Sequence, residues 1–362
     1  MLTTGPVSSS PPPAPSRRAR PAPLRAVAGI VLRSVARLVV ILWLVATVTF
    51  VAVRALPGNP VDVWMQEMQR TGITAEEARA QASRLLGIDV NKPLWQQYLE
   101  YLDNLIHFDL GRSVILLPGA PVTDLLGERI LWTLFSVGIA MVVAFLIGLW
   151  LGSVAAYRRG TWVDRVISYG GALFDSIPPI LLGILLTFTL GVGLGIVPIQ
   201  SMRGAYDPGV TPGFNAPFIL SALSHAILPG IVYVFGSVGG WALLMRSSAI
   251  TVLKDDYVTQ ARARGLAERT IRTSYVVRNA QLPLVTGFAI SLGFIISGSV
   301  LIESVFVYPG VGQLLANALA RRDYTVMQGV VIITTVTVLL ATAIADALYS
   351  WLDPRTRDER AA

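Results

Sequence analysis

Long runs of uncharged, apolar residues constrain this chain more than any other feature of its sequence. Crossing the roughly 30 Å hydrocarbon layer of a bilayer takes about 20 such residues in a helix. The chain is 53% hydrophobic and only 14% charged, which is more apolar than a soluble domain. The pattern predicts an all-α membrane protein with six transmembrane helices. The six runs are Leu38–Val53, Ile130–Tyr157, Ile177–Met202, Phe218–Met245, Asn279–Ile302 and Val326–Ala345.

Basic residues are distributed unevenly between the two sides of these runs. The two terminal tails and the segments 158–165 and 246–278 carry 19 of the 29 lysines and arginines. Basic residues accumulate on the cytoplasmic side of membrane proteins, which predicts that both termini are cytoplasmic. The formal net charge of +7 lies beside the runs without interleaved aromatic residues, so it indicates contact with anionic membrane lipid and not with nucleic acid.

The runs divide the chain into five segments. Residues 1–24 are rich in Pro and Arg and are predicted to form a disordered cytoplasmic tail. Residues 25–56 are predicted to form the first transmembrane helix. An extracytoplasmic helical insert follows at 57–128, where Thr74 and Glu77 indicate a capping box and Pro93 indicates a helix start. The main transmembrane domain covers 129–350 with a cytoplasmic loop at 247–283, and a cytoplasmic tail covers 351–362.

Motifs for catalysis are absent from the sequence. A nucleotide-binding P-loop needs a lysine in a Gly-Lys-Ser/Thr core, and the two lysines, Lys92 and Lys254, lie in other contexts. The two histidines, His107 and His225, stand far apart without ligands at metal-binding spacing, and the chain has no cysteine. We therefore expect no catalytic residue, no metal and no cofactor bound by this chain, so it is not expected to be an enzyme.

Three acidic residues lie in or beside the apolar runs: Asp175, Glu303 and Asp346. An ionisable group near the centre of a bilayer costs about 2.5–3.5 kcal/mol, so such groups normally face protein or water and suggest function. Two roles fit each acid, one as a lining residue of a transport pathway and one as a structural hydrogen-bonding group. The third run can begin near Val166 if Asp175 is tolerated inside the protein.

The polar stretch from Asp255 to Pro283 has the pattern of two short helices. Asp255 and Asp256 are suitable N-caps, and Gly265 can end the first helix in the left-handed conformation. A second helix is predicted from Ala267 to Ala280. The stretch is expected to form a cytoplasmic protrusion that another protein could bind, although its arginines are also typical of a plain membrane anchor.

The same stretch resembles a known family. "DYVTQARARGL" and the following "VRNAQLP" resemble the cytoplasmic coupling loop of type I ABC importer permeases, in the dipeptide, oligopeptide and nickel family. Thr259 and Gln260 replace the first two residues of the general Glu-Ala-Ala pattern. The resemblance implies contact with an ATPase at Asp256, Tyr257, Ala261, Arg262, Ala263, Arg264, Gly265, Leu266, Arg269, Arg278, Asn279 and Pro283.

Further matches extend the resemblance along the chain. "LPGNP" resembles the segment after the first span of the permease type with an extracytoplasmic insert, with Asn59 in an aspartate position. "KPLWQQYLEYLDNLIHFDLGRSV" resembles that insert, and "IESVFVYPGVGQLL" and "ALYSWLDPR" resemble segments around the fifth and sixth spans. The resemblance implies a type I ABC importer permease (MetI-like) architecture, with 129–350 as the permease domain.

The resemblance also implies a function and partners. The chain would be a multi-pass inner-membrane permease that forms half of a pathway for short peptides. Its partners would be a second homologous permease subunit, two ABC ATPase subunits or domains that hold ATP and Mg, and an extracytoplasmic solute-binding protein. A nickel or glutathione-like solute is an alternative cargo, and an ion-coupled secondary transporter is an alternative class.

Overall fold

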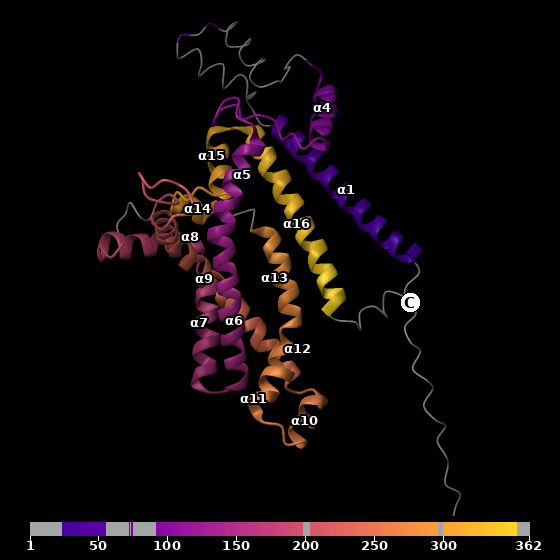
Figure 1. Ribbon diagram of the computed structural model, residues 1–362, viewed down its shortest axis with the longest axis vertical. Helices are drawn as coiled ribbons and strands as arrows, with labels where there is room; N and C mark the ends of the chain where they lie inside the picture. Colours follow the sequence, from indigo (N-terminus) through magenta and orange to yellow (C-terminus); the bar gives the residue numbers. More distant parts are fainter. Residues whose placement is uncertain are drawn as a thin grey trace, which may run out of the picture. The chain divides into compact units, whose positions relative to one another are not determined.

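The computed structural model describes residues 24–55, 72, 74, 92–197, 203–295 and 300–352. These residues form helices and connecting turns, with no β-strand among them (Figure 1). The chain divides into two compact units, Met1–Trp43 and Leu44–Ala362, and the contacts described below belong to the second. The predicted tail up to residue 23, "LPGNP", Glu77 of the predicted capping box, the insert between 57 and 91 apart from residues 72 and 74, and residues 353–362 lie outside the described residues.

The helices before the cytoplasmic loop include two π-helical stretches, labelled η. Their bounds are α1 Leu24–Ala55, α4 Leu94–Ile106, α5 Val122–Thr133, η1 Leu134–Gly138, α6 Ile139–Tyr157, α7 Trp162–Ser176, α8 Pro179–Leu186, η2 Thr187–Gly193 and α9 Ala216–Val252.

The loop and the helices after it complete the order. Their bounds are α10 Asp256–Ala263, α11 Glu268–Thr270, η4 Ile271–Val277, α12 Arg278–Ala280, α13 Leu282–Phe294, α14 Val300–Val305, α15 Val311–Arg321 and α16 Tyr324–Leu352.

Among the described residues, four helices are long and apolar enough to cross a membrane. They are the segment Ala36–Val53 of α1, the continuous helix Val122–Tyr157, α9, and Tyr324–Ile344 of α16. A fifth candidate is a bent pair, α7 followed by α8 and η2. The apolar helix α13 is shorter, with 13 residues. The helical membrane architecture is confirmed, while the count of six spans and the side of the termini stay predictions.

The bend between α7 and α8 lies at the start of the predicted third run, Ile177–Met202, and it interrupts the longer version of that run that begins near Val166. The two helices meet at an angle of 93°. Pro178 disfavours the helical conformation of Ile177, which is extended with ψ 119°. Pro178 and Pro179 also lack the amide hydrogens that would continue the helix. The two prolines therefore end α7 at Ser176 and start α8 in a new direction.

Glycine allows α6 and α7 to approach α9 closely (Figure 1). A Cβ atom at Gly239 of α9 would lie 2.1 Å from the carbonyl oxygen of Gly171 in α7. A Cβ atom at Gly152 of α6 would lie 2.3 Å from the carbonyl oxygen of Ala242. Small residues promote this kind of helix association in membranes because dispersion contacts between the backbones replace those with lipid.

Polar contacts hold the ends of the helices. At one end, the buried carboxylate of Asp164 in α7 pairs with Arg246 of α9, with Oδ1–Nε at 2.6 Å and Oδ2–Nη2 at 3.0 Å. The backbone amide of Gly160 and the hydroxyl of Ser168 also donate to Asp164. This network fixes the turn between α6 and α7 against α9.

A second buried carboxylate, Asp323, lies just before α16. Its Oδ2 accepts hydrogen bonds from the hydroxyl of Ser113 at 2.6 Å and from the backbone amides of Ile115 and Leu116 at 2.9 Å. The surrounding core includes Val122 of α5 and Val326 of α16. Asp323 therefore ties the end of the insert to the start of the last helix.

The described part of the insert packs on the end of α1. α4 begins at Leu94 after Pro93, as the sequence predicted. The hydroxyl groups of Tyr98 and Thr47 lie 2.7 Å apart, and the rings of Tyr98 and Tyr101 both contact Phe50. The aromatic residues of α4 form a packing face at this point.

Candidate functional site

The first arm of the cytoplasmic loop is the helix α10, which ends as its sequence predicted. Asp255 is its N-cap residue, although its side chain makes no capping hydrogen bond, and Asp256 lies in the first turn. Gly265 follows the helix with φ +73°. The amide of Gly265 donates to the carbonyl of Arg262, and the amide of Leu266 donates to the carbonyl of Ala261. These two bonds form a Schellman motif, which needs a left-handed residue at the glycine position.

The second arm is helical from Glu268 to Ala280, with the π-helical stretch η4 in its middle. The side-chain amide of Asn279 donates to the hydroxyl of Tyr257 at 3.1 Å and to the carbonyl of Tyr275 at 2.7 Å. Because Tyr257 belongs to α10, the side chain of Asn279 joins the two arms. The loop is a hairpin of two helices and not an extended linker.

The inner face of the hairpin is buried against the membrane helices. Val258 and Ala261 of α10 and Ile271 and Val276 of η4 are at most 3% exposed. Their core also contains Phe145, Met245, Ala249 and Leu284 from α6, α9 and α13. α9 extends to Val252, so residues 247–252 of the expected loop continue the membrane helix. The hairpin is thus packed directly onto the ends of three membrane helices.

The outer end of the hairpin is exposed over an unbroken stretch from Arg262 to Thr270. Arg262 pairs with Glu268 across the turn at 3.0 Å, and this hydrogen bond raises the pKa of the Arg262 guanidinium above its usual range. Within the described part of the chain, Arg264 and Arg269 form no ion pair. The tip therefore presents two uncompensated positive charges to the surroundings.

The residues that the resemblance assigns to ATPase contact divide between this tip and the base of the hairpin. Ala263, Arg264, Gly265, Leu266 and Arg269 lie at the tip with Arg262. Asp256, Tyr257, Arg278, Asn279 and Pro283 are exposed nearer the membrane helices, and Ala261 is buried. The sequence did not indicate Arg272, whose guanidinium carbon lies 5.7 Å from the centre of the Tyr157 ring and holds the second arm against α6.

Glu303 is enclosed by the turn that precedes α15. Its carboxylate is 1% exposed, and it accepts hydrogen bonds from the hydroxyl of Thr133 at 3.0 Å and the amide of Gln313 at 3.1 Å. A Cβ atom at Gly310 would lie 2.3 Å from this carboxylate, so a larger residue there would displace the carboxylate from its hydrogen bonds. Glu303 caps the start of α15 from another helix, which favours its structural role.

The other two acids have different surroundings. Asp175 lies in the last turn of α7, next to the bend, and its side chain is exposed. Asp346 belongs to α16, and its side chain lies outside the described residues. The structure does not bring the three candidate acids into one described site.

Two acids that the sequence did not single out are more deeply embedded in the packing. Asp164 and Asp323 are 4% and 0% exposed. Asp164 lies in the basic segment 158–165, and Asp323 follows Arg321 and Arg322. The partners of Asp323 at 113–116 are more than 200 residues away in the sequence, so no local signal marked it.

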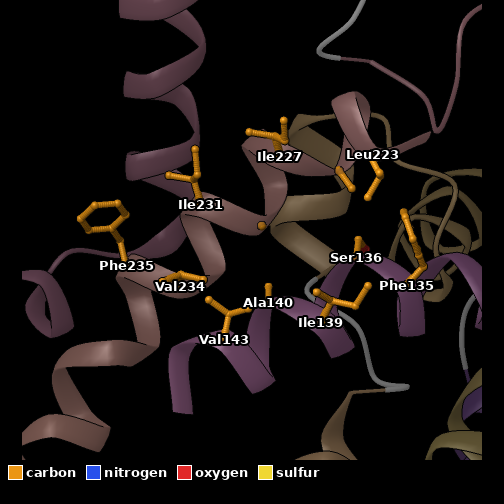
Figure 2. Close-up of a pocket in the computed structure, with 12 residues that line it drawn as sticks. Phe135, Ser136, Ile139, Ala140, Val143, Leu223, Ile227, Ile231, Val234 and Phe235 are labelled. Atoms are coloured by element: carbon orange, nitrogen blue, oxygen red, sulfur yellow. The ribbon is translucent and has the colours of Figure 1, made fainter. Parts of the chain in front are cut away.

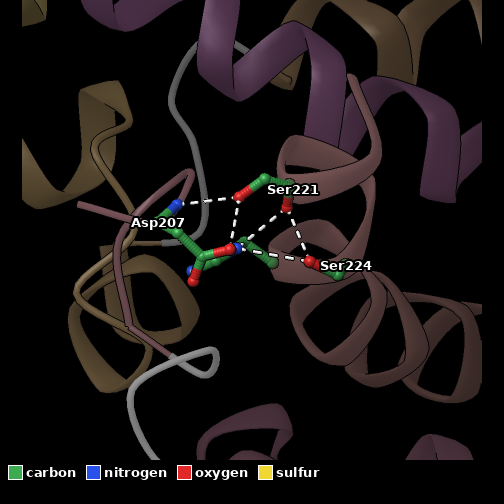
Figure 3. Close-up of polar contacts among 4 residues, drawn as sticks. Asp207, Ser221 and Ser224 are labelled. Atoms are coloured by element: carbon green, nitrogen blue, oxygen red, sulfur yellow. Dashed lines mark hydrogen bonds and ion pairs between the residues drawn. The ribbon is translucent and has the colours of Figure 1, made fainter. Parts of the chain in front are cut away.

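Both histidines occupy structural positions. His107 is the C-cap of α4, and its Nδ1 lies 2.9 Å from the carbonyl of Asp103. His225 is buried in α9, with its Nδ1 2.8 Å from the carbonyl of Ser221 and its Nε2 3.8 Å from Asp207. In Figure 3 the hydroxyl of Ser221 faces the Asp207 carboxylate, with Oγ–Oδ2 at 2.8 Å. The hydroxyl of Ser224 lies 3.4 Å from His225 Nδ1, but that nitrogen donates to the carbonyl of Ser221 and so cannot take a proton from serine as the base of a catalytic triad does.

An apolar pocket of about 420 Å³ lies between η1 and α6 on one side and α9 on the other. Figure 2 shows Ile139 and Val143 facing Ile227, Ile231 and Phe235 across it. The hydroxyl of Ser136, a polar group in this lining, donates to the carbonyl of Trp132. The pocket therefore has no free polar group that would orient a polar solute.

Comparison with known proteins agrees with this arrangement. The family described as "Binding-protein-dependent transport system inner membrane component" matches residues 148–358. The "Di/tripeptide transport system permease protein DppB" of Pseudomonas aeruginosa is 33% identical over 331 residues, covering 87% of this chain and 95% of that protein.

Two further relatives are similar over comparable lengths. The "Dipeptide transport system permease protein DppB" of Escherichia coli is 34% identical, covering 87% of this chain and 95% of its own length. The "Oligopeptide transport system permease protein AppB" of Bacillus subtilis is 30% identical, covering 91% and 99%. The family match, together with the apolar helices and the hairpin that packs on them, shows that the chain belongs to the family of inner membrane components of binding-protein-dependent transport systems.

Proposed function

We propose that this chain forms half of the translocation pathway of an ATP-driven importer of short peptides. Its partners in this proposal are a second homologous permease, two ABC ATPase subunits or domains and an extracytoplasmic solute-binding protein. The family membership supports the transport role. The names of the three relatives, which transport dipeptides, tripeptides or oligopeptides, support a peptide as the cargo and favour it over nickel or a glutathione-like solute.

One observation carries the coupling role of the hairpin. Its tip from Arg262 to Thr270 is exposed, while its inner face shares a core with Met245 of α9 and Leu284 of α13. A protein interior is close-packed and transmits displacement, so a force applied to the tip moves the ends of these helices. A plain membrane anchor needs the charges but not this packing. We therefore assign the tip to the ATPase contact.

The assignment of ATP hydrolysis to a partner protein follows from the residues that this sequence lacks. ATP and Mg are assigned to the partner ATPase because this chain has no Walker lysine. Closure of the ATPases around ATP would move the docked hairpins, and the membrane helices would then reorient around the substrate path. Such a change between two packed arrangements is a common form of mechanical coupling.

A charge reversal at the tip tests this assignment. Arg264→Glu with Arg269→Glu places acids at a contact built for bases, where unfavourable charge pairs cost several kcal/mol. This choice leaves the ion pair of Arg262 with Glu268 in place. The matched control is Arg158→Glu with Arg159→Glu, which changes two exposed arginines in the turn between α6 and α7.

The expected results differ between the two pairs. The tip variant should lose ATP-driven dipeptide uptake and co-purify with less ATPase, whereas the control should keep both. Equal loss of uptake from both pairs with unchanged ATPase binding would show that the tip arginines act only as anchors. Uptake that continues after ATP depletion and stops when the ion gradient collapses would instead support a secondary transporter.

A further inference from the structure

The end of α7 leaves backbone acceptors without their helical donors. In a helix, the carbonyls of Phe174 and Asp175 would accept from the amides four residues later. Those positions are Pro178 and Pro179, which have no amide hydrogen. The carbonyl of Phe174 accepts instead from the amide of Ile177 at 3.2 Å. The carbonyl of Asp175 loses its donor, and the negative end of the α7 dipole lies at the same place.

The carboxylate of Asp175 adds a full negative charge to this helix end. Its side chain is exposed, and within the described residues it makes no hydrogen bond or ion pair. It lies beside α9 at Gly240, where an added Cβ atom would be 3.3 Å from Oδ1. Glycine at this position leaves the carboxylate accessible along the α9 surface.

Asp175 lies far from the predicted cytoplasmic end of α7, so the exposure of its carboxylate needs an explanation. With a rise of about 1.5 Å per residue, Asp175 lies roughly 16 Å along α7 from Asp164, which pairs with Arg246 at the predicted cytoplasmic end. That distance is about half of the hydrocarbon thickness. The neighbouring surface is apolar, since the rings of Phe174 and Phe235 pack with their centres 4.9 Å apart. A carboxylate at this depth is costly unless it faces water or a positive group.

We propose that Asp175 and the carboxyl end of α7 form a transient subsite for the N-terminal ammonium group of a peptide in transit. The ammonium group would donate hydrogen bonds to the carboxylate and to the freed carbonyl of Asp175. Broken membrane helices bind small cations in this way, through the carbonyls at the end of a half-helix. The inference rests on the proposed importer function and adds the chemical group that the pathway recognises.

A peptide ammonium fits this site better than a metal ion does. Divalent metal ions need several ligating side chains, and no group of three or more His, Cys, Asp or Glu occurs within the described ranges. An ammonium group needs only a few acceptors, and a single carboxylate with a carbonyl supplies them. Every short peptide with a free amino terminus carries this group, so the subsite would be independent of the peptide side chains.

The test uses the complete importer in proteoliposomes, with labelled dialanine and the solute-binding protein. Asp175→Asn should reduce the number of peptides imported per ATP hydrolysed by about tenfold, the loss expected for one charged hydrogen bond. The ATPase rate stimulated by loaded binding protein should stay unchanged, because the assembly is intact. Asp175→Glu should restore import. The control Glu128→Gln neutralises an exposed acid on α5 and should leave import unchanged.

A labelling experiment tests access independently. The chain has no cysteine, so Asp175→Cys creates its only thiol. A water-soluble thiol reagent should label this thiol in the assembled importer, and dialanine should slow the labelling. Absence of labelling would overturn the proposal by showing that the position faces lipid or packed protein.

Three other outcomes are distinguishable. Normal import per ATP by Asp175→Asn would overturn the ammonium subsite while leaving the importer function intact. Loss of the second permease from purified Asp175→Asn complexes would also overturn it, since the acid would then pair with a cation of that subunit. Failure of the wild-type complex to couple ATP hydrolysis to dialanine import would instead remove the proposed function itself.

Discussion

The carboxylate of Asp164 accepts two hydrogen bonds from the guanidinium of Arg246, at 2.6 and 3.0 Å, and this ion pair joins α7 to α9. The Asp164 side chain is 6% exposed and that of Arg246 is 28% exposed. Removing Arg246 would leave the buried Asp164 carboxylate without its counter-charge, and removing Asp164 would leave the partly buried Arg246 guanidinium without its own. The pair is therefore expected to be more sensitive to a single substitution than ion pairs on the surface.

Asp164→Ala should destabilise the folded chain by about 3 kcal/mol, because Arg246 then has no counter-charge. The measurement is the midpoint temperature of unfolding of the detergent-solubilised protein, followed by fluorescence-detected size exclusion. Asp124→Ala, at an exposed position in α5, is the control and should leave the midpoint nearly unchanged. Equal midpoints for the two variants would contradict the structural role of the pair.

Gly239→Ala should impair folding more than any exposed glycine substitution. The added Cβ atom would lie 2.1 Å from the carbonyl oxygen of Gly171, and a backbone atom cannot move aside as a side chain can. Overpacking of this kind costs about 1–3 kcal/mol or more. Gly170→Ala is the matched control, since its Cβ atom would meet nothing within 4 Å. The yield of monodisperse protein distinguishes the two, and similar yields would show that the helices separate easily.

Asp323→Ala should loosen the turn at 113–117. Alanine removes the carboxylate oxygen that accepts from the amides of Ile115 and Leu116 and from the hydroxyl of Ser113. A buried donor that is left without its acceptor lowers the stability of the fold by about 1–3 kcal/mol. Hydrogen–deuterium exchange should rise at residues 114–116 while staying constant in α9. Unchanged exchange at these amides would mean that Asp323 does not hold the turn.

The topology can be tested with fusions. A reporter fused after Arg264 should behave as cytoplasmic, and one fused near Glu77 should behave as extracytoplasmic, because the basic segments fix the orientation. Alkaline phosphatase and a fluorescent protein give opposite readings on the two sides. The reverse pattern at either position would overturn the predicted arrangement of six spans.

Local patterns in the sequence predicted the local structure well. Gly265 ends α10 through its left-handed conformation, and Pro93 precedes α4, because both residues act on the backbone within one turn. The apolar runs predicted the helical membrane fold. The bend at Pro178 and Pro179 was not predicted, because the third run was allowed to begin near Val166 as one span.

Contacts between distant residues could not be predicted in the same way. Asp323 meets the amides of 114–116 only after α5 and α16 have packed together, and the contact of Gly171 with Gly239 depends on the crossing of α7 and α9. The surroundings of Asp175 depend on the bend as well. Hydrophobic periodicity reports which face of a helix is buried, but it does not report the partner.

The glycine contacts also determine which parts of the molecule can move separately. α6 and α7 each touch α9 backbone to backbone, so neither can slide along α9 without steric clashes, and the three helices form one close-packed group. α13 and α16 form another close pair, since a Cβ atom at Gly293 would lie 2.7 Å from that of Ala341. Between these two groups the chain passes only through the cytoplasmic hairpin. The hairpin packs against both groups, through Met245 of α9 and Leu284 of α13, so a partner that displaced the hairpin would push on both groups at once.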